Sequence, residues 1–456
     1  MNRKTIFILT AVAIIAAFTL IACSPAATPA PQPTTAPAPV QPTAAPAQPT
    51  AAPAAQAVEI RWRTRPDNKQ EQDVYQKISD EVTAKLKDKG ITLKYDPAPV
   101  TGYEDKLKAE FSGGNAPDVV WIPGASTADY ANLGVIADIM PLAKADANFK
   151  LTDYYDAPMK ELQNNGKLWG LPRDISTLVI YYNKDLLKAA GAPDPAELAA
   201  KGEWNWDNFL KVAKAATNPD KKQYGFDFSN WWGPWGYFVY GAGGNFFNAD
   251  RTQCALNSPE AQAGLQFMAD LIQKDKVAPA PGIEGGVGET GFLSGQIAMF
   301  PNGRWMTPGM RENAKFDWGV VEMPKGKQNS TWLFWGPYVM NAKLSPEKQK
   351  AAWEVMKALT SPEVQAQVAA LGANIPSNKD KAAVDAFLNS KPPADNTPFI
   401  KGAEYAQAEI PLYTGNWGDI VGSQYQPAVD KIIAGKATVA DATAAACKAS
   451  DPLFKK

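Results

Sequence analysis

The pattern of hydrophobic and polar positions changes twice along the chain. Behind Arg3 and Lys4, residues 5–22 form an uncharged apolar run, and residues 24–57 are dominated by Ala, Pro, Thr and Gln without a charged residue. From Val58 onward, short apolar runs alternate with stretches in which apolar residues recur about every four positions. The first two patterns predict a secretory signal peptide and a disordered tether, and the third predicts a folded body.

The folded body begins with alternating strand and helix patterns. Apolar runs predict strands at 58–62, 91–95 and 118–122, and recurring apolar positions predict helices over 74–86 and 103–111. Short connections between them favour an α/β layer with a mostly parallel sheet, in which ligands bind beyond the carboxyl ends of strands. Two such lobes fit the remaining length better than one. Later strands are expected at 178–182, 296–300, 318–321 and 338–341, and later helices at 183–190, 206–216, 259–275 and 345–359.

The end of the first apolar run carries a possible lipidation signal. Leu20, Ile21 and Ala22 precede Cys23, an arrangement that looks like a bacterial lipobox, and an uncharged segment follows at once. We therefore expect a signal peptide at 1–22, a lipidated Cys23, and a Pro/Ala/Thr-rich tether over 23–57. The alternative is an uncleaved transmembrane helix, because the run is just long enough to span a bilayer.

Charge and composition exclude several functions. The 46 Lys and Arg nearly balance the 47 Asp and Glu, so there is no electrostatic argument for binding nucleic acid or an anionic membrane surface. The chain has no histidine, which excludes Ser-His-Asp and Cys-His catalysis and the usual histidine-ligated zinc sites. It holds 14 Trp, 15 Tyr and 18 Phe, so its composition favours ligand binding over catalysis.

Several short motifs in the folded body follow one another in a characteristic order. They lie at 103–107, 116–121, 166–172, 182–187, 295–300 with 302–305, and 345–347. In order and spacing the set resembles the family 1 extracellular solute-binding proteins of ABC sugar importers, relatives of maltose-binding protein. The resemblance extends from Val58 to about Ala449.

The resemblance implies an α/β fold of the type II periplasmic-binding-protein class, a two-lobed clamp that closes on a ligand in its cleft. It implies an N-terminal lobe of residues 58–175 and 336–378 and a C-terminal lobe of residues 176–335 and 379–456. A lipid-anchored, monomeric receptor outside the cytoplasm would capture a sugar or oligosaccharide and deliver it to the transmembrane subunits of an ABC permease, without catalysis, cofactor or metal. The three interlobe crossings are expected near 174–178, 333–337 and 375–381.

Aromatic residues are the first candidates for the ligand site, because sugars present apolar C–H faces to aromatic rings. Trp121 lies at the carboxyl end of the predicted strand 118–122, although a tryptophan in a strand is often part of the core. In the family's pattern, 123–127 is a place for charged maltose ligands, and the uncharged sequence here argues against maltose itself. The other aromatic candidates, each with a core position as its alternative, are Trp231, Trp232, Trp235, Trp305, Trp335 with Gly336, Tyr413 and Trp417.

Polar candidates for the sugar hydroxyls lie beside the predicted cleft. Arg65 and Asp67 follow the first strand, and Arg173 and Asp174 lie beside the first crossing. The alternative for these charged residues is an interlobe salt bridge, which contributes little when it is exposed. The glycine-rich run at 282–291 lacks the Lys-Ser/Thr ending of a phosphate loop, so we expect an ordinary loop there.

Cys254 and Cys447 remain after Cys23 is assigned to the lipid. Both fall in the C-terminal lobe that the resemblance implies, and leftover cysteines outside the cytoplasm commonly pair. We expect a disulfide, with two separate buried thiols as the alternative.

Two other functions compete with sugar capture. In the first alternative the same clamp binds a polyamine or a glycerol-phosphate-type solute, and a polyamine would require several carboxylates around an aromatic box. A surface glycoside hydrolase would need two carboxylates roughly 5–9.5 Å apart across the scissile bond. Acidic residues are plentiful, but no local motif points to such a pair.

Overall fold

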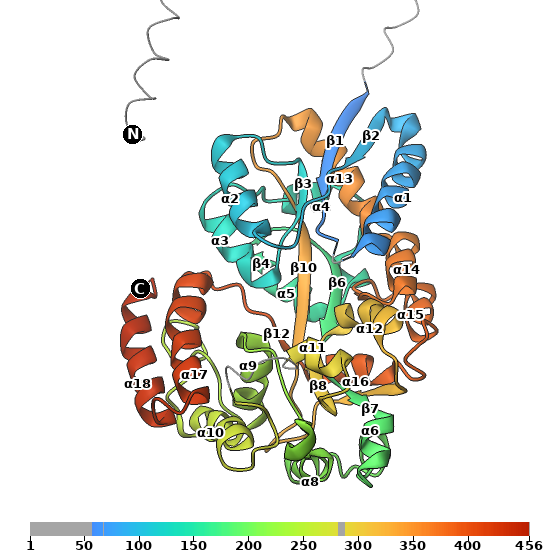
Figure 1. Cartoon of the computed structure of the whole chain (residues 1–456). Coiled ribbons are helices and arrows are strands. Elements are labelled where there is room, and N and C mark those ends of the chain that lie inside the picture. Colours follow the sequence, from blue (N-terminus) through green and yellow to red (C-terminus); the bar gives the residue numbers. More distant parts are fainter. Residues whose placement is uncertain (1–56, 67, 281–287, 456) are drawn as a thin grey trace, which may run out of the picture. The chain divides into compact units, whose positions relative to one another are not determined.

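The computed structural model describes residues 57–66, 68–280 and 288–455, and Figure 1 shows their elements. Its largest sheet has the strand order β11-β6-β10-β3-β1-β2, with β12 paired to β10. Strands β1, β2 and β3 are parallel, whereas β10 is antiparallel to both β3 and β6. The strands are β1 (Val58–Arg63), β2 (Ile91–Tyr95), β3 (Val119–Trp121), β6 (Leu171–Thr177), β10 (Trp332–Met340), β11 (Ile375–Pro376) and β12 (Gln407–Ala408).

A second sheet has β7 (Val179–Asn183) between β8 (Met299–Asn302) and β9 (Trp318–Glu322), and both pairings are antiparallel. A short hairpin joins β4 (Gln163–Asn164) to β5 (Lys167–Leu168). Beyond β1–β3 only the short pair of β10 with β12 is parallel among the described strands, so the expectation of mostly parallel sheets is wrong for the later strands. Helical crossovers make β1–β3 parallel, but long insertions separate the later strands and impose no such direction.

A first hydrophobic cluster surrounds the large sheet and extends to one side of β7. Its longest helix, α1, begins where Asn68 Oδ1 accepts a hydrogen bond from the Glu71 amide at 2.9 Å, and it buries Tyr75, Ile78 and Val82. The predicted helix over 74–86 is thus present and starts one turn earlier. The helices that contribute to this cluster are α1 (Lys69–Lys85), α2 (Tyr103–Gly113), α3 (Thr127–Asn132), α4 (Met140–Ala145), α5 (Asp156–Glu161), α11 (Gly288–Leu293), α12 (Thr307–Asn313), α13 (Pro346–Leu359), α14 (Pro362–Leu371), α15 (Lys381–Leu388) and α16 (Thr397–Tyr405).

A second hydrophobic cluster lies between the other face of β7 and a group of helices that follow β7 in the chain. Helix α8 begins as predicted, with Asn205 Oδ1 accepting from the Asn208 amide at 3.0 Å. Figure 1 shows α17 and α18, in red, beside α10. The helices of this cluster are α6 (Lys184–Ala189), α7 (Pro195–Ala200), α8 (Trp206–Ala216), α9 (Trp232–Gly241), α10 (Pro259–Gln273), α17 (Gln426–Ile433) and α18 (Val439–Ser450).

The segments at the three expected crossings are neighbours in the large sheet. Ile175 of β6 pairs with Trp335 of β10 on one side and with Ile375 of β11 on the other. Both β6 and β10 are long strands that run side by side through the centre of Figure 1. Each of them carries residues that were predicted to bind the ligand.

The glycine-rich run and the N-terminal segment carry two further expectations from the sequence. Residues 288–291 belong to helix α11, so the expected loop at 282–291 is wrong there, while 281–287 lie outside the described residues. The signal peptide, Cys23 and the tether up to residue 56 also lie outside them. Within the described ranges, no helix combines the length and the apolar character that crossing a bilayer requires.

Candidate functional site

A cavity of about 520 Å³ lies beside the central strands and the start of α9. Strands β3, β6 and β10 contribute from the large sheet, and the segments around Trp231 and Trp417 contribute from the second cluster. Most of the residues predicted to bind ligand are therefore brought together. They are Arg65, Trp121, Arg173, Asp174, Trp231, Trp232, Trp305, Trp335, Gly336 and Trp417.

One side of the cavity is aromatic, and Phe334 of β10 is at its centre. The Phe334 ring centroid lies 5.3 Å from those of Trp231 and Trp305 and 5.4 Å from that of Trp232. Trp417 extends the cluster with its centroid 5.0 Å from Trp232. Trp231, Trp232 and Trp305 remain half-buried, so they retain ring surface that a ligand can contact.

Local backbone features place these rings. Helix α9 begins directly after Trp231, which leaves the half-buried Trp231 and Trp232 at its start. A Cβ on Gly303 would lie only 2.2 Å from the Trp305 ring, so glycine lets that ring fold back over the loop. Trp417 immediately precedes a π-helical segment, Gly418–Tyr425, and such segments are frequent at functional sites.

Two arginines of the cavity lining lie against Trp121. The Arg173 and Arg65 guanidinium carbons are 4.7 and 5.1 Å from the Trp121 ring centroid. Arg173 Nε also donates to Asp174 Oδ2 at 2.6 Å. A Cβ on Gly336 would lie 2.0 Å from Trp121 Nε1, so only glycine permits this packing. Trp121 therefore holds the two cations in place more than it offers a free face to a ligand.

Glu409 is a buried carboxyl group on the wall of the cavity. Burial raises the pKa of Glu409 to about 8, although the backbone N–H groups of Ala125, Trp335 and Gly124 act in the opposite direction. At neutral pH the protonated form predominates. Glu409 therefore adds a hydrogen-bonding group to the cavity without a full negative charge.

Sequence reasoning missed several cavity residues. Phe334 is adjacent to the predicted Trp335, and Asn302 belongs to the motif that contains Trp305, so a wider reading of those two motifs would have found them. Two further carboxylates have neutral partners, since Ser126 Oγ donates to Glu104 at 2.6 Å and Asn302 Nδ2 donates to Glu289 at 3.4 Å. Pro123, Ala125 and Ser126 fall in the segment 123–127, which the family's pattern marks as a place for ligands, although their uncharged side chains argued against maltose. No sequence signal marks the remaining residues, which are Glu104, Ser176, Ser229, Glu289, Asn374 and Glu409.

Three predicted ligand residues are not found in this cavity. Trp235 is fully buried, where it stacks on Phe246 at 4.8 Å and donates from Nε1 to Gln426 at 2.9 Å. This core position is a correction, because a ring with no exposed surface cannot meet a ligand. Tyr413 is half-buried and lies outside the cavity lining. Asp67 lies outside the described residues.

The two remaining cysteines meet on the outer side of the second cluster. Cys254 and Cys447 form a disulfide across 193 residues of sequence, with their Cα atoms 5.1 Å apart. The bridge ties the loop before α10 to α18 and lies outside the cavity lining.

A cavity that combines a cluster of tilted and edge-to-face aromatic rings with several polar side chains defines a protein that binds a small solute. Comparison with known proteins gives the particular class. Residues 80–395 match the family described as "Bacterial extracellular solute-binding protein", and the chain belongs to that family. The resemblance seen in the sequence is thereby confirmed, and as a member the protein binds its solute outside the cytoplasm.

Individual relatives agree with this assignment. A binding protein of Brucella abortus (strain 2308) is 23% identical over 330 residues, which are 70% of this chain and 76% of the relative. The galactooligosaccharide-binding protein of Bacillus subtilis (strain 168) is 28% identical over 271 residues, 56% of this chain and 59% of the relative.

The fold also matches a solved structure. An ABC substrate-binding protein of Listeria monocytogenes, in complex with cycloalternan, superposes with a TM-score of 0.77 at 23% identity and covers 87% of this chain and 99% of its own. The predicted two-lobed α/β fold of periplasmic-type binding proteins is confirmed.

Proposed function

We propose that the protein is the lipid-anchored receptor of an ABC importer and that it captures a sugar or oligosaccharide in the cavity described above. The observation that carries the proposal is the pairing of the Phe334-centred aromatic cluster with arginine, carboxyl and amide groups in one cavity. Aromatic rings bind the C–H face of a sugar ring, and the polar groups bind its hydroxyls. The names of the Bacillus and Listeria relatives support the same ligand class.

Capture requires that the cavity open and close. We place the N-terminal lobe at residues 58–175 and 336–378 and the C-terminal lobe at 176–335 and 379–456. The adjacent strands β6, β10 and β11 then form the hinge, which supports closure by rotation about a narrow base. The closed, monomeric form would present its surface to the permease and release the sugar unchanged.

The charges of the cavity favour a sugar over a polyamine. Among the described residues, four carboxyl groups line it, but Asp174 is paired with Arg173 at 2.6 Å and Glu409 is mostly protonated at neutral pH. Arg65 and Arg173 add positive charge to the same cavity. A polycation would meet two arginines there, whereas neutral hydroxyls can bind every one of these groups.

A thermal-shift screen tests the proposal. The panel contains mono- and oligosaccharides, sugar alcohols, glycerol phosphates and polyamines, and only a true ligand raises the melting temperature in a concentration-dependent way. We expect a sugar to do so and to be recovered intact. Stabilisation by a polyamine alone, or release of cleaved sugar, would overturn the assignment.

The anchor is tested separately. The lipobox and the uncharged segment that follows it motivate the proposal that Cys23 carries the lipid. Cys23→Ser should move the protein from the membrane fraction to the medium or periplasm and leave its melting temperature unchanged. Retention of Cys23→Ser in the membrane with an intact leader would favour a transmembrane helix instead.

A further inference from the structure

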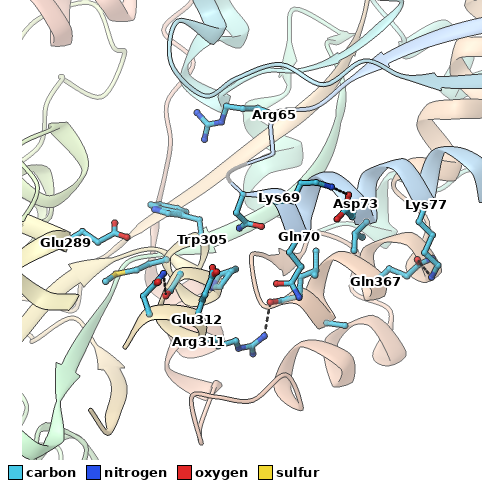
Figure 2. A pocket seen from close by; sticks show the side chains of 18 residues that line it. Arg65, Lys69, Gln70, Asp73, Lys77, Glu289, Trp305, Arg311, Glu312 and Gln367 are labelled. Carbon is cyan, nitrogen blue, oxygen red and sulfur yellow. Dashed lines mark hydrogen bonds and ion pairs between the residues drawn. The ribbon is translucent and has the colours of Figure 1, made fainter. Parts of the chain in front are cut away.

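A second and larger cavity adjoins the aromatic one. It measures about 1130 Å³ and meets the first cavity at three shared residues, Arg65, Glu289 and Trp305. Figure 2 shows this space from close by, with the ring of Trp305 between Glu289 and the side chains of α12. A solute that occupies the first cavity can therefore continue past Trp305 into the second.

The second cavity differs from the first in chemistry. Its lining comes mainly from α1, α12 and α14, and Trp305 is the one aromatic residue among the described residues that line it. Amides and charged groups dominate the rest. Such a surface offers hydrogen bonds to hydroxyls but no stacking platform beyond the junction.

Some polar groups in this cavity are already occupied. Arg311 donates to the carbonyl oxygens of Leu371, Ser390 and Pro392 at 2.8, 2.6 and 2.8 Å. The Gln367 amide accepts from Lys77 at 3.1 Å and donates to Glu81 at 2.8 Å. Lys69 is paired with Asp73. The contacts of Arg311 and Gln367 thereby join α12 to α14 and α14 to α1, and these occupied groups form part of the cavity's wall.

Gln70 and Glu312 differ from these occupied groups because their side chains are exposed and available to a ligand. Both side chains are exposed, both line the cavity, and neither has a hydrogen bond or an ion pair with any residue in the described part of the chain. In Figure 2 they reach into the same space from α1 and α12. Water must satisfy them in the free protein, and exchanging water for sugar hydroxyls costs little.

We propose that the second cavity is an extension of the binding site, in which Gln70 and Glu312 bind the hydroxyls at one end of an oligosaccharide whose other end stacks in the aromatic cavity. This inference rests on the proposed function. It makes the solute a chain that is longer than the aromatic cavity alone accommodates. The protein then selects for chain length, with Trp305 in contact with the unit that passes between the cavities.

The test measures affinity by calorimetry for malto-, galacto- and arabinooligosaccharides, each from the disaccharide to the hexasaccharide. The variants are Gln70→Ala, Glu312→Ala and their combination. The control is Gln76→Ala, which removes the same side chain from an exposed position of α1 outside both cavities. Melting temperatures without sugar verify that each variant is folded.

For a series that binds, we expect the hexasaccharide to bind the unmodified protein at least about tenfold more tightly than the disaccharide. The combined variant should bind the hexasaccharide with about tenfold lower affinity, which corresponds to the loss of two hydrogen bonds. Its affinity for the disaccharide should fall by less than about twofold. Gln76→Ala should change neither affinity.

Equal affinity for short and long members would overturn the inference and leave the proposed function intact. So would a preference for long chains that the combined variant does not reduce. If no member of the three series binds, the inference fails as well, and the wider screen then decides separately whether the proposed function fails with it.

Discussion

Two tryptophans that lie three positions apart in α9 should respond to truncation in opposite ways. Trp232 lines the cavity and is half-buried, whereas Trp235 is fully buried in the second cluster. Trp232→Ala and Trp235→Ala remove the same side chain from the same helix. The pair therefore separates a ligand contact from a core contact with helix propensity held constant.

The expected magnitudes follow from burial. Trp235 stacks on Phe246 and donates a hydrogen bond to Gln426, so its truncation should lower the free energy of unfolding by about 3–5 kcal/mol. Trp232 has ring contacts with four aromatic neighbours but keeps exposed surface, and about half that loss, roughly 2 kcal/mol, is expected. Loss of its face for the sugar should weaken binding by at least ~2 kcal/mol, or about 30-fold.

The assay combines urea unfolding without ligand and calorimetric titration with a sugar identified by the thermal-shift screen. Titrations are made at a temperature where both variants are folded, which circular dichroism verifies. We expect near-normal affinity for Trp235→Ala and weak binding for Trp232→Ala. A Trp232→Ala protein that binds normally, or a Trp235→Ala protein that unfolds normally but binds weakly, would refute the assignment of the two rings.

Three further predictions concern the rest of the fold. Glu409 stays protonated in the folded state up to about pH 8 but ionises near pH 4.5 when the chain is unfolded. The free energy of unfolding should therefore fall by up to about 5 kcal/mol as the pH rises from 4.5 to 8. Glu409→Gln should abolish this fall, which urea unfolding at each pH measures. Arg251 donates to both carboxylate oxygens of Glu161 at 2.7 Å and so joins the second cluster to α5 of the first. Glu161→Gln should lower the free energy of unfolding by about 1–3 kcal/mol. It should also increase the radius of gyration of the ligand-free protein, measured by X-ray scattering. Reduction of the Cys254–Cys447 disulfide should cost about 2–5 kcal/mol, measured as a lower melting temperature, and leave sugar affinity near normal.

An element of the fold can be predicted from the sequence when residues close together in the chain determine it. The alternation over residues 58–122 is predictable because helices α1 and α2 have regular apolar faces and the connections are short. The direction of β10 is not, because its antiparallel pairing with β3 joins residues more than 200 positions apart. Helix α9 is equally hard to predict, because glycine and proline interrupt its first turn. Its remaining residues are almost all buried, so they show no alternation of apolar and polar faces.

The candidate site is predictable where aromatic residues mark it. Trp121 ends β3, Trp335 lies in β10, and Trp305 follows β8, so each lies at or near a strand that sequence reasoning can locate. Their roles are less predictable, because Trp121 packs against two guanidinium groups and so supports them more than it faces the ligand. A ring's partners come from tertiary packing, which a single sequence does not reveal.

The carboxyl groups of the cavity mark the limit of sequence reasoning. Glu104 begins α2, Glu289 begins α11 and Glu409 follows β12, and an acidic residue in the first turn of a helix is common for reasons of helix stability alone. Nothing local distinguishes these three from the many acidic residues on the surface. Only the tertiary fold brings them together in the lining of one cavity. The class of ligand can thus be inferred from the aromatic residues, whereas the identity of the sugar depends on polar groups whose positions only the folded chain determines.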